Sequence, residues 1–472
     1  MDRRKSLIAG QCTDSDEEFA VNNPYNGQHL ADVANAGSEL IERSLAAARS
    51  AADKMRSLPR FQIAKGLRAI SARIEERKED FTRSIALESA KPVICARGEV
   101  DRAIATFSWA AGEAERYAGE TVPIDVQASG RSKWGRTIRV PRGVIYGVTP
   151  FNFPLNLVAH KVAPALATGN AIIIKPSPRT PLTSLLLGEV FLESGLPSAA
   201  LQIVPTDVAN VLRIVNDDRV AMISFTGSAA VGWELKNNVG KKPIALELGG
   251  NAPVIIDESA DLERSLSRTL LGSFAYSGQV CISVQRVYIH CSNFEEWISG
   301  FVSGAEALKR GDPLDEKTQI SVMIDQAAAE RAEAWTNEAV DNGAKILSGG
   351  KRDRSFFEPT ILTNTDPEML VVAEEVFAPI VVVEKVGSFE EGLDAANNSK
   401  YGLQAGVFSN DQDNINLAIE RLEYGGIIIN DAPIFRVDNM PYGGMKESGF
   451  GREGVRYAMD EMTEIKLVVQ DS

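Results

Sequence analysis

Three side chains in this sequence have the chemistry to transform a carbonyl group. Cys281 follows a pair of small residues, Ser277-Gly278, that would let the backbone turn tightly, and its thiolate would be a strong nucleophile. Glu247 ends an apolar run, where a carboxylate is costly to bury unless it has a use. Asn152 stands in a loop stiffened by two prolines, which suits an amide that donates to a developing oxyanion.

Each of these residues also has an ordinary structural interpretation. Most unpaired cysteines are small buried hydrophobes, an acid often lies in a solvated loop, and an asparagine commonly forms a turn. Lys175 follows an apolar run and could reach a ribose or phosphate, or simply extend its ammonium into solvent. Gly227 and Ser228 precede a predicted helix, where backbone N–H groups favour a phosphate, although the pattern is neither a standard dinucleotide fingerprint nor a P-loop.

The composition of the 472-residue chain limits the alternatives. A net charge of −14 argues against a nucleic-acid surface, and three histidines leave little room for a histidine-rich metal site, so we expect no metal. Four scattered cysteines predict no disulfide framework and indicate a reducing compartment, the cytoplasm. The sequence has neither a secretory signal nor about 20 uninterrupted apolar residues, so we expect no membrane span.

The elements that must position these residues are those of an α/β protein. Residues 37–118 have helical periodicity, and short apolar strands then alternate with helices, which predicts a parallel sheet covered on both faces. The strands of this sheet are predicted at 144–148, 171–174, 201–204, 222–225 and 244–247. A second α/β unit follows, with strands at 287–290 and 380–383. Residues 120–141 read as a hairpin that pairs with another subunit, and 463–469 as a last strand.

Together, the motifs resemble the aldehyde dehydrogenase superfamily over almost the whole chain, and their order and spacing fit as well. The segments that carry this resemblance are Thr149-Pro150-Phe151-Asn152-Phe153-Pro154, Lys175-Pro176-Ser177, Phe225-Thr226-Gly227-Ser228, Leu246-Glu247-Leu248-Gly249-Gly250, Gly278-Gln279-Val280-Cys281, Glu374-Glu375-Val376-Phe377-Ala378-Pro379 and Pro441-Tyr442-Gly443-Gly444. The resemblance implies a Rossmann-like dinucleotide-binding domain (1–119 and 142–249), a catalytic α/β domain (250–455) and an oligomerisation arm (120–141 and 456–472) in a homodimer or homotetramer.

The same resemblance implies a reaction and a cofactor, NAD or NADP. Cys281 attacks the aldehyde, Asn152 and the backbone N–H of Cys281 hold the oxyanion, Glu247 activates water to release the acid, and Lys161 lies near this centre. The residues implied to bind the dinucleotide are Lys175, Ser177, Arg179, Gly227, Ser228, Glu375 and Phe377. Many NAD-preferring members carry a glutamate where Pro178 stands, so we expect NADP to be accepted.

The substrate side departs from the common pattern and favours a small polar or anionic aldehyde. His160 stands where many members have tryptophan, and Asn156 adds a second polar group. Arg436 and Arg102 are candidate partners for an anion, although both could equally be surface ion pairs. Residues 435–441 resemble those of lactaldehyde and phosphonoacetaldehyde dehydrogenases.

Other activities remain open at this stage. The chain could acylate coenzyme A or act as a thioesterase, be a catalytically silent homologue, or bind a nucleotide as a regulator. Branches that acylate coenzyme A usually lack the residue that Glu247 supplies, so its presence favours hydrolysis and a non-acylating enzyme. An intact set of Cys281, Glu247 and Asn152 argues against a silent homologue.

Overall fold

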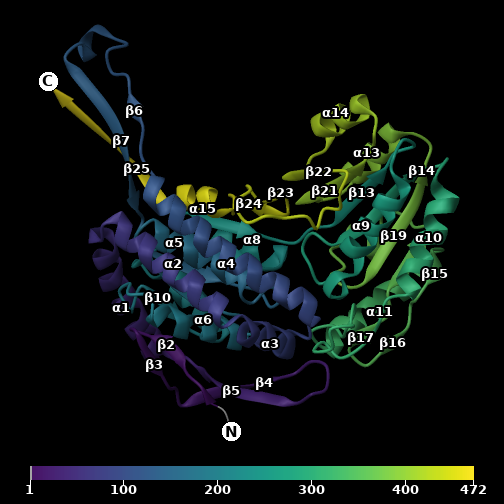
Figure 1. Ribbon diagram of the computed structural model, residues 1–472, viewed down its shortest axis with the longest axis horizontal. Helices are drawn as coiled ribbons and strands as arrows, with labels where there is room; N and C mark the ends of the chain where they lie inside the picture. The colour runs from purple at the N-terminus through teal and green to yellow at the C-terminus, as the bar shows by residue number, and fades with distance from the viewer. Residues whose placement is uncertain (1–2, 472) are drawn as a thin grey trace.

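The chain folds into two α/β units, each built on a parallel sheet, and a three-stranded arm that projects from the first unit (Figure 1). The computed structural model describes residues 3–471. The first unit, purple to teal, and the second, green, lie next to each other along the long axis. This arrangement confirms the predicted α/β fold class with a Rossmann-like parallel sheet.

The first sheet is parallel at its centre and antiparallel at its edges. In spatial order its strands are β24 (Gly449–Phe450), β12 (Ile244–Glu247), β11 (Val220–Thr226), β8 (Val144–Val148), β9 (Ala171–Lys175), β10 (Leu201–Ile203), β2 (Ser6–Ile8) and β3 (Gln11–Thr13). The five strands from β12 to β10 pair in parallel and lie close to their predicted ends. They are continuous apolar runs because helices cover both faces of the sheet.

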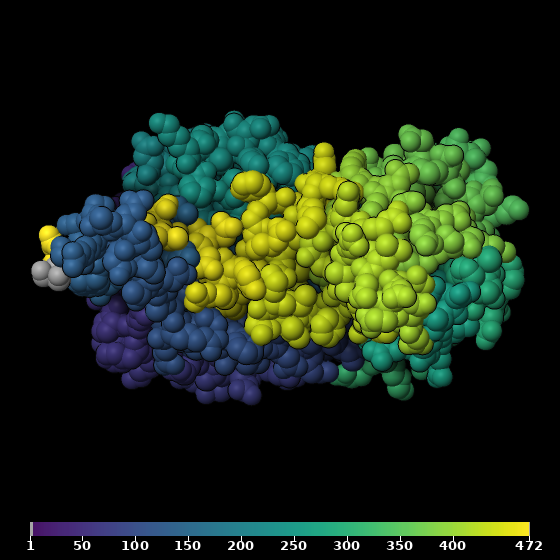
Figure 2. All heavy atoms as spheres, turned by 90° about the horizontal axis from the view of Figure 1, so that it is seen from above, coloured from purple at the N-terminus to yellow at the C-terminus, as the bar shows by residue number. Residues whose placement is uncertain are grey.

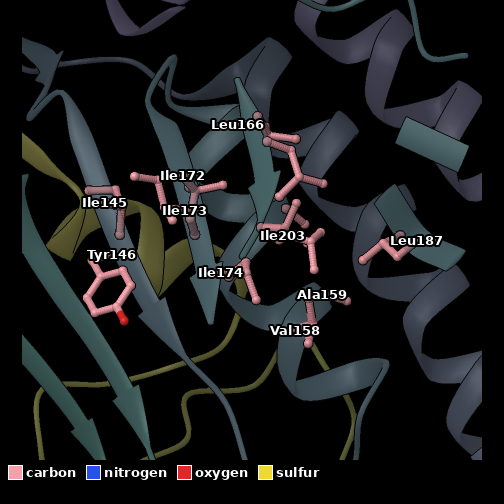
Figure 3. Packing of buried hydrophobic residues seen from close by; sticks show 14 of the residues in the cluster. Ile145, Tyr146, Val158, Ala159, Leu166, Ile172, Ile173, Ile174, Leu187 and Ile203 are labelled. Carbon is pink, nitrogen blue, oxygen red and sulfur yellow. The ribbon is translucent and has the colours of Figure 1, made fainter. Parts of the chain in front are cut away.

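Helices pack on this sheet to form the larger of the cores. They are α1 (Ser38–Ser57), α2 (Arg60–Glu76), α3 (Lys78–Ser89), α4 (Val93–Arg116), α5 (Asn156–Ala167), α6 (Leu182–Leu192), α7 (Val208–Asn216) and α8 (Ala229–Asn238). The predicted helical region thus divides into four helices. Figure 3 shows Val158 of α5 and Leu187 of α6 close to Ile174 and Ile203 of the sheet, all of them buried. The apolar faces of these helices supply the burial that stabilises the unit.

The second sheet has seven strands, all parallel except at one edge. In spatial order these are β15 (Lys345–Ser348), β18 (Thr360–Thr363), β19 (Ile380–Val386), β14 (Val284–His290), β13 (Ala252–Ile256), β21 (Gln404–Phe408) and β22 (Gly426–Ile429). Its helices are α9 (Leu262–Phe274), α10 (Phe294–Glu306), α11 (Gln326–Asp341), α12 (Leu370–Ala373), α13 (Phe389–Asn397) and α14 (Gln412–Arg421). The remaining short strands are β1 (Arg3–Arg4), β4 (Glu17–Asn22), β5 (His29–Asn35), β16 (Arg352–Asp353), β17 (Phe356–Phe357), β20 (Tyr401–Gly402) and β23 (Met445–Lys446).

The arm contains the predicted hairpin, but its strands are unequal. β6 (Thr121–Val122) is shorter than predicted because Pro123 cannot donate to a ladder, whereas β7 (Lys133–Pro141) is longer. A single 3₁₀ turn, Ala128–Gly130, lies between them. The C-terminal strand β25 (Thr463–Asp471), predicted at 463–469, pairs antiparallel along all of β7, so the arm is a sheet of three strands.

The C-terminal segment returns from the second unit to the first, as the yellow spheres of Figure 2 show. β24 pairs with β12, and Val455 and Met459 of helix α15 (Val455–Glu461) are buried in the first core. These contacts differ from the predicted boundary, which gave residues up to 455 to the second unit and the following residues to the arm. The sequence pattern missed this return because β24 is only two residues long. The wider domain division stays a prediction.

None of the described helices is long and apolar enough to cross a membrane. Within residues 3–471, no three His, Cys, Asp or Glu side chains gather in a way that could hold a metal ion.

Candidate active site

A cavity of about 480 Å³ lies between the two units, at the carboxyl ends of the first sheet's central strands. Ligands of open α/β sheets bind at this edge, because the strands deliver their loops there. Residues far apart in the sequence meet in its wall. Those with chemical function are Asn152, Ser228, Glu247, Cys281 and Glu375. The structure therefore brings the three predicted reactive groups together in one cavity.

Cys281 reaches the cavity through a strained turn. Tyr276, Ser277 and Gly278 precede it with φ values of 49°, 54° and 69°, in the left-handed region. A Cβ on Gly278 would lie 2.2 Å from the carbonyl oxygen of Ala378, so only glycine fits there. Small residues before the cysteine predicted a tight turn, and these φ values confirm it. Strain of this kind costs about 1–3 kcal/mol per residue and persists only where the surroundings hold it.

The thiol of Cys281 lies in a mixed electrostatic environment. Burial raises its pKa to about 11, and the carboxyls of Glu375 and Glu247 act in the same direction. Tyr442, whose hydroxyl lies 3.0 Å from Sγ, and the guanidinium of Arg436 act in the opposite direction. At neutral pH the sulfur therefore holds its proton until a base or a bound ligand changes this balance.

Glu247 ends β12 with its carboxyl group inside the cavity wall. Both carboxylate oxygens are buried, and neither has a hydrogen-bond partner among the described residues. Burial raises the pKa of Glu247 well above 4.5, and the nearby Glu453 carboxylate adds to the shift, while Arg436 and Lys161 oppose it. A carboxyl group with a raised pKa is a suitable general base near neutral pH, and its free oxygens can accept from a water molecule.

Asn152 lies in the loop that follows β8, buried beside the turn of Cys281. Its amide nitrogen donates one hydrogen bond, of 3.1 Å, to the carbonyl oxygen of Gln279. An amide nitrogen carries two hydrogens, so the second remains available to a ligand in the cavity. The contact with Gln279 fixes the amide next to the cysteine turn, as an oxyanion donor requires.

The remaining cavity wall fits a dinucleotide. Gly227 and Ser228 line it where α8 begins, Ser228 being the N-cap residue, so the N–H groups of the first turn are available to a phosphate.

The second unit contributes Glu375 to this wall. Its carboxylate accepts from the backbone N–H of Gly250 at 3.1 Å, and burial raises its pKa to about 7. Phe377 lines the same wall, edge-on to Phe151 with ring centroids 5.8 Å apart. The buried hydroxyl of Thr226 has no partner within the described chain, which leaves it for a ligand.

Three predicted cofactor residues lie outside the main cavity wall. Lys175 and Ser177 are buried at and just beyond the end of β9, the strand next to β8, and burial lowers the pKa of Lys175. Arg179 is exposed and forms a 2.6 Å ion pair with Asp325, which does line the cavity. These residues therefore flank the cavity rather than form it, and Arg179 of the first unit pairs across to Asp325 of the second.

The predicted substrate residues converge on one carboxylate that the sequence did not reveal. Asn156 and His160, four positions apart on α5, both contact Asp438 Oδ1, at 3.1 and 2.7 Å. Arg102 of α4 forms an ion pair with the same carboxylate at 2.8 Å. Arg436 Nη2 lies 3.4 Å from His160 Nδ1. The structure thus brings the four predicted substrate residues together. The side chain of Arg102 is partly buried in its ion pair with Asp438.

Arg436 and Lys161 share a second buried carboxylate, Glu453. Lys161 Nζ lies 3.0 Å from Glu453 Oε1 and also donates to Ser224, while Arg436 lies 3.4 Å from Glu453 Oε2. The side chain of Arg436 is only 5% exposed, so it is not a surface ion pair. Its Nε has no hydrogen-bond partner in the described structure.

The buried network contains three basic side chains, those of Arg102, Lys161 and Arg436. Burial alone would raise the pKa of Glu453, but the charges of Lys161 and Arg436 act against burial, and that pKa is lowered to about 2. Burial and Arg436 lower the pKa of His160, so its imidazole is neutral. Arg102 is paired with Asp438, while Lys161 and Arg436 share Glu453, so three cations face two carboxylates.

Comparisons with known proteins agree with this geometry. A family model described as "Aldehyde dehydrogenase family" matches residues 12–468. The chain belongs to the aldehyde dehydrogenase family. It is an oxidoreductase that acts on aldehydes with a nicotinamide dinucleotide.

Two curated members of the family illustrate the relationship. 3-Sulfolactaldehyde dehydrogenase of Priestia aryabhattai is 40% identical over 464 residues, which are 98% of this chain and 97% of the relative. Lactaldehyde dehydrogenase of Methanocaldococcus jannaschii is 40% identical over 462 residues, 96% of this chain and 97% of the relative. They confirm the resemblance to lactaldehyde dehydrogenases, and the resemblance to phosphonoacetaldehyde dehydrogenases stays a prediction.

Two solved structures of aldehyde dehydrogenases share the fold throughout. Aldehyde dehydrogenase 21 from Physcomitrella patens, in complex with the reaction product succinate, is 40% identical with a TM-score of 0.98, over 100% of this chain and 98% of that one. Glyceraldehyde-3-phosphate dehydrogenase from Methanocaldococcus jannaschii, complexed with NADP, is 38% identical with a TM-score of 0.93, over 97% and 100%.

Three residues of this aldehyde dehydrogenase escaped the sequence reasoning. Asp438 and Glu453 are single acids in loops, and nothing local shows that they are buried. Tyr442 lies in the Pro441-Tyr442-Gly443-Gly444 motif that supported the resemblance, but the motif gave it no role. The signal available for Tyr442 was its chemistry, a phenol directly before a pair of glycines.

Proposed function

We propose that this enzyme oxidises a short aldehyde with a polar or anionic end to the carboxylic acid, through a thioester on Cys281. Cys281 Sγ attacks the carbonyl carbon to form a thiohemiacetal. The second N–H of the Asn152 amide and the backbone N–H of Cys281 hold the oxygen that becomes an oxyanion. One such donor contributes about 2.7–4 kcal/mol to catalysis.

The second half of the reaction belongs to Glu247. A bound nicotinamide would supply the hydride acceptor for this oxidation, and Cys281 would then hold the oxidised carbon as a thioester. Glu247 then takes a proton from water, whose oxygen attacks the thioester carbon. The C–S bond breaks, the acid leaves and the sulfur is restored. The positive charge of Lys161 lowers the pKa of both Glu453 and Glu247 and so favours their carboxylate forms. The free, buried oxygens of Glu247 support hydrolysis over transfer to coenzyme A.

The dinucleotide would be held by the wall described above. Gly227 and Ser228 bind the pyrophosphate, Glu375 the nicotinamide ribose, and Phe377 packs beside it. Lys175, Ser177 and Arg179 flank the adenosine end. Pro178 brings no carboxylate to repel a 2′-phosphate, and the exposed Arg179 could exchange Asp325 for one, so we propose that NADP is accepted as well as NAD.

The unpartnered Nε–H of Arg436 carries the substrate proposal. A buried guanidinium donor without an acceptor is costly, and a ligand with an anionic or polar end would satisfy it. The excess of cations over carboxylates in the same network favours negative charge, and His160 and Asn156 hold the Asp438 carboxylate within it. Relatives named for sulfolactaldehyde and lactaldehyde, and a structure holding succinate, act on or release molecules of this kind.

A matched pair of aldehydes tests this proposal. Succinic semialdehyde and its methyl ester have nearly the same shape, but only the first is an anion. We expect a higher kcat/KM for the anion, and we expect Arg436→Met to lower that value about 10- to 100-fold while affecting the ester less. Both cofactors and product analysis with coenzyme A belong in the same assay, because a coenzyme A thioester product would contradict hydrolysis.

The control for this variant is Arg310→Met. Arg310 also stacks on an aromatic ring, 3.9 Å from the centroid of Phe356, but it lies on the surface away from the cavity. Arg310→Met should leave kcat/KM for both aldehydes unchanged. Equal losses on the two aldehydes in Arg436→Met would contradict an anion site, and strong exclusion of NADP would contradict dual cofactor use.

We further propose a cytoplasmic homodimer or homotetramer. Cys12 and Cys291 are exposed free thiols, as suits a reducing compartment. The arm leaves alternate apolar side chains of β25 uncovered, a pattern typical of a strand that pairs or packs with another subunit.

A further inference from the structure

We propose that the Tyr442 hydroxyl donates a hydrogen bond to Sγ of Cys281 and stabilises its thiolate, and that Arg436 holds the tyrosine ring in place. Tyr442 touches the reacting sulfur directly, whereas Arg436 positions the Tyr442 ring and also acts on the sulfur by its charge. The inference rests on the proposed function in one respect only, that Cys281 is the nucleophile.

The geometry fixes the hydroxyl before any ligand binds. Tyr442 Oη lies 3.0 Å from Cys281 Sγ, within hydrogen-bond distance for sulfur. The guanidinium carbon of Arg436 lies 3.6 Å from the centre of the Tyr442 ring, so the two planar groups are in stacking contact. Both side chains are buried.

The backbone of Tyr442 is held as firmly as its ring. Its N–H donates to the carbonyl oxygen of Glu453 at 3.0 Å, and the N–H of Glu453 donates back at 2.6 Å. Glu453 also pairs with Arg436, which stacks on the ring. Backbone and side-chain contacts therefore join the same two segments, and a hydroxyl held from both ends needs little reorganisation during reaction.

The chemistry of the pair decides which atom donates. Burial raises the pKa of Tyr442 well above 10, and the Cys281 sulfur raises it further, so the phenol keeps its proton. A thiolate can only accept, so the hydrogen bond runs from Oη to Sγ and strengthens when the sulfur becomes charged.

The charged groups around the pair give this hydrogen bond its importance. Glu247 and Glu375 face the sulfur and oppose its ionisation, as burial does. Arg436 faces both Cys281 and Tyr442 and favours negative charge on each, while Asp438 and Glu453 in turn surround Arg436. Tyr442 and Arg436 thus supply the attraction that offsets burial and two carboxyls.

Thiol reactivity measured without aldehyde or dinucleotide tests the proposal. The full chain is alkylated with iodoacetamide across a range of pH, and the rate is followed on the Cys281 peptide by mass spectrometry. We expect Tyr442→Phe, which removes only the hydroxyl, to move the midpoint of the pH profile up by about one unit. Below the midpoint this is about a tenfold slower reaction. An unchanged or lower midpoint would overturn the proposal.

Further variants keep the result unambiguous. Tyr146→Phe removes a buried hydroxyl that has no hydrogen-bond partner in the first core, and it should leave the midpoint unchanged. Arg436→Met keeps the hydroxyl but frees the ring, and it should also raise the midpoint. Should Tyr442→Phe fail to fold, Arg436→Lys decides in its place, because it keeps the positive charge but loses the planar group that stacks on the ring; an unchanged midpoint in it overturns the inference. Because the readout concerns the thiol itself, failure to oxidise any aldehyde would refute the proposed function without affecting this test.

Discussion

At the scale of single residues, burial makes both the nucleophile and the base harder to deprotonate than they are in water. Burial raises the pKa of Cys281 to about 11 and that of Glu247 well above its ordinary value. Their working forms, a thiolate and a carboxylate, are the deprotonated ones. The same burial makes each group more reactive once charged, because little water competes for it.

The rate of aldehyde oxidation should therefore increase with pH. Each group loses its proton as pH rises through its raised pKa, so kcat/KM should climb as the pH rises above neutral toward about 11, the pKa of Cys281. Initial rates in buffers of constant ionic strength, with circular dichroism to confirm folding at each pH, measure this. Rates that fall steadily above neutral pH in a folded protein would contradict the assigned roles.

The sequence predicted the reactive residues but not their surroundings. Cys281, Glu247 and Asn152 carry their chemistry in their residue types and motifs, and the fold brings them to one cavity. The buried network could not be predicted in the same way, because Asp438 and Glu453 become partners of Arg102, His160, Arg436 and Lys161 only after distant segments meet. Of the two alternatives left open for Arg436, a surface ion pair was wrong for this reason.

At the scale of elements, the turn before the cysteine is the feature on which placement depends. It joins the short 3₁₀ segment Ala275–Gly278 to the loop that leads into β14. Three successive left-handed residues turn the chain so that the sulfur faces the cavity. Close packing of Gly278 against Ala378 holds the backbone in this strained conformation.

Gly278→Ala should both destabilise the protein and misplace the sulfur. The new Cβ would lie 2.2 Å from the Ala378 carbonyl oxygen, at a φ of 69°. We expect a loss of about 2–4 kcal/mol in the free energy of unfolding, with backbone strain and the clash both contributing. Chemical denaturation measures the first effect, and the alkylation rate of Cys281 measures the second.

Gly195→Ala is the matched control for that substitution. Gly195 has a φ of 77°, yet nothing lies within 4 Å of its Cβ position. It should cost only the left-handed strain, about 1–2 kcal/mol, and leave Cys281 reactivity as it is. Equal losses of stability and reactivity in the two variants would show that close packing at Gly278 is unimportant.

Element prediction succeeded where the apolar pattern was long. The central strands of the first sheet are buried on both faces, and their sequences show it as uninterrupted runs such as Ile172–Ile174. It failed at β24 and at the shortened β6, where pairing is decided by partners elsewhere in the chain. Two-residue strands leave no periodic signal.

At the scale of the whole molecule, the arm is the part that the monomer does not use for its own core. β6, β7 and β25 project from the first unit (Figure 1), and Ile465, Leu467 and Val469 alternate along β25 with 60%, 54% and 47% of their surface exposed. Three exposed apolar side chains on one face of a strand are expected to be covered by another subunit.

Leu467→Asp should weaken assembly while leaving the fold of each subunit intact. A charge placed in the centre of this apolar face would have to be desolvated on association. Light scattering coupled to gel filtration should show a smaller species than the wild type, with an unchanged far-UV spectrum. A wild-type protein that is already monomeric at micromolar concentration would contradict the oligomer proposal.

The most direct test of the central claim is the mass of the enzyme during turnover of Glu247→Gln. The account predicts that this variant, mixed with succinic semialdehyde and NADP, forms about one NADPH per active site and then slows about 10²- to 10⁴-fold. Rapid acid quenching followed by intact-mass and peptide analysis should then find a succinyl thioester on Cys281. Wild-type turnover by the variant, or an unmodified Cys281 after the burst, would contradict the account.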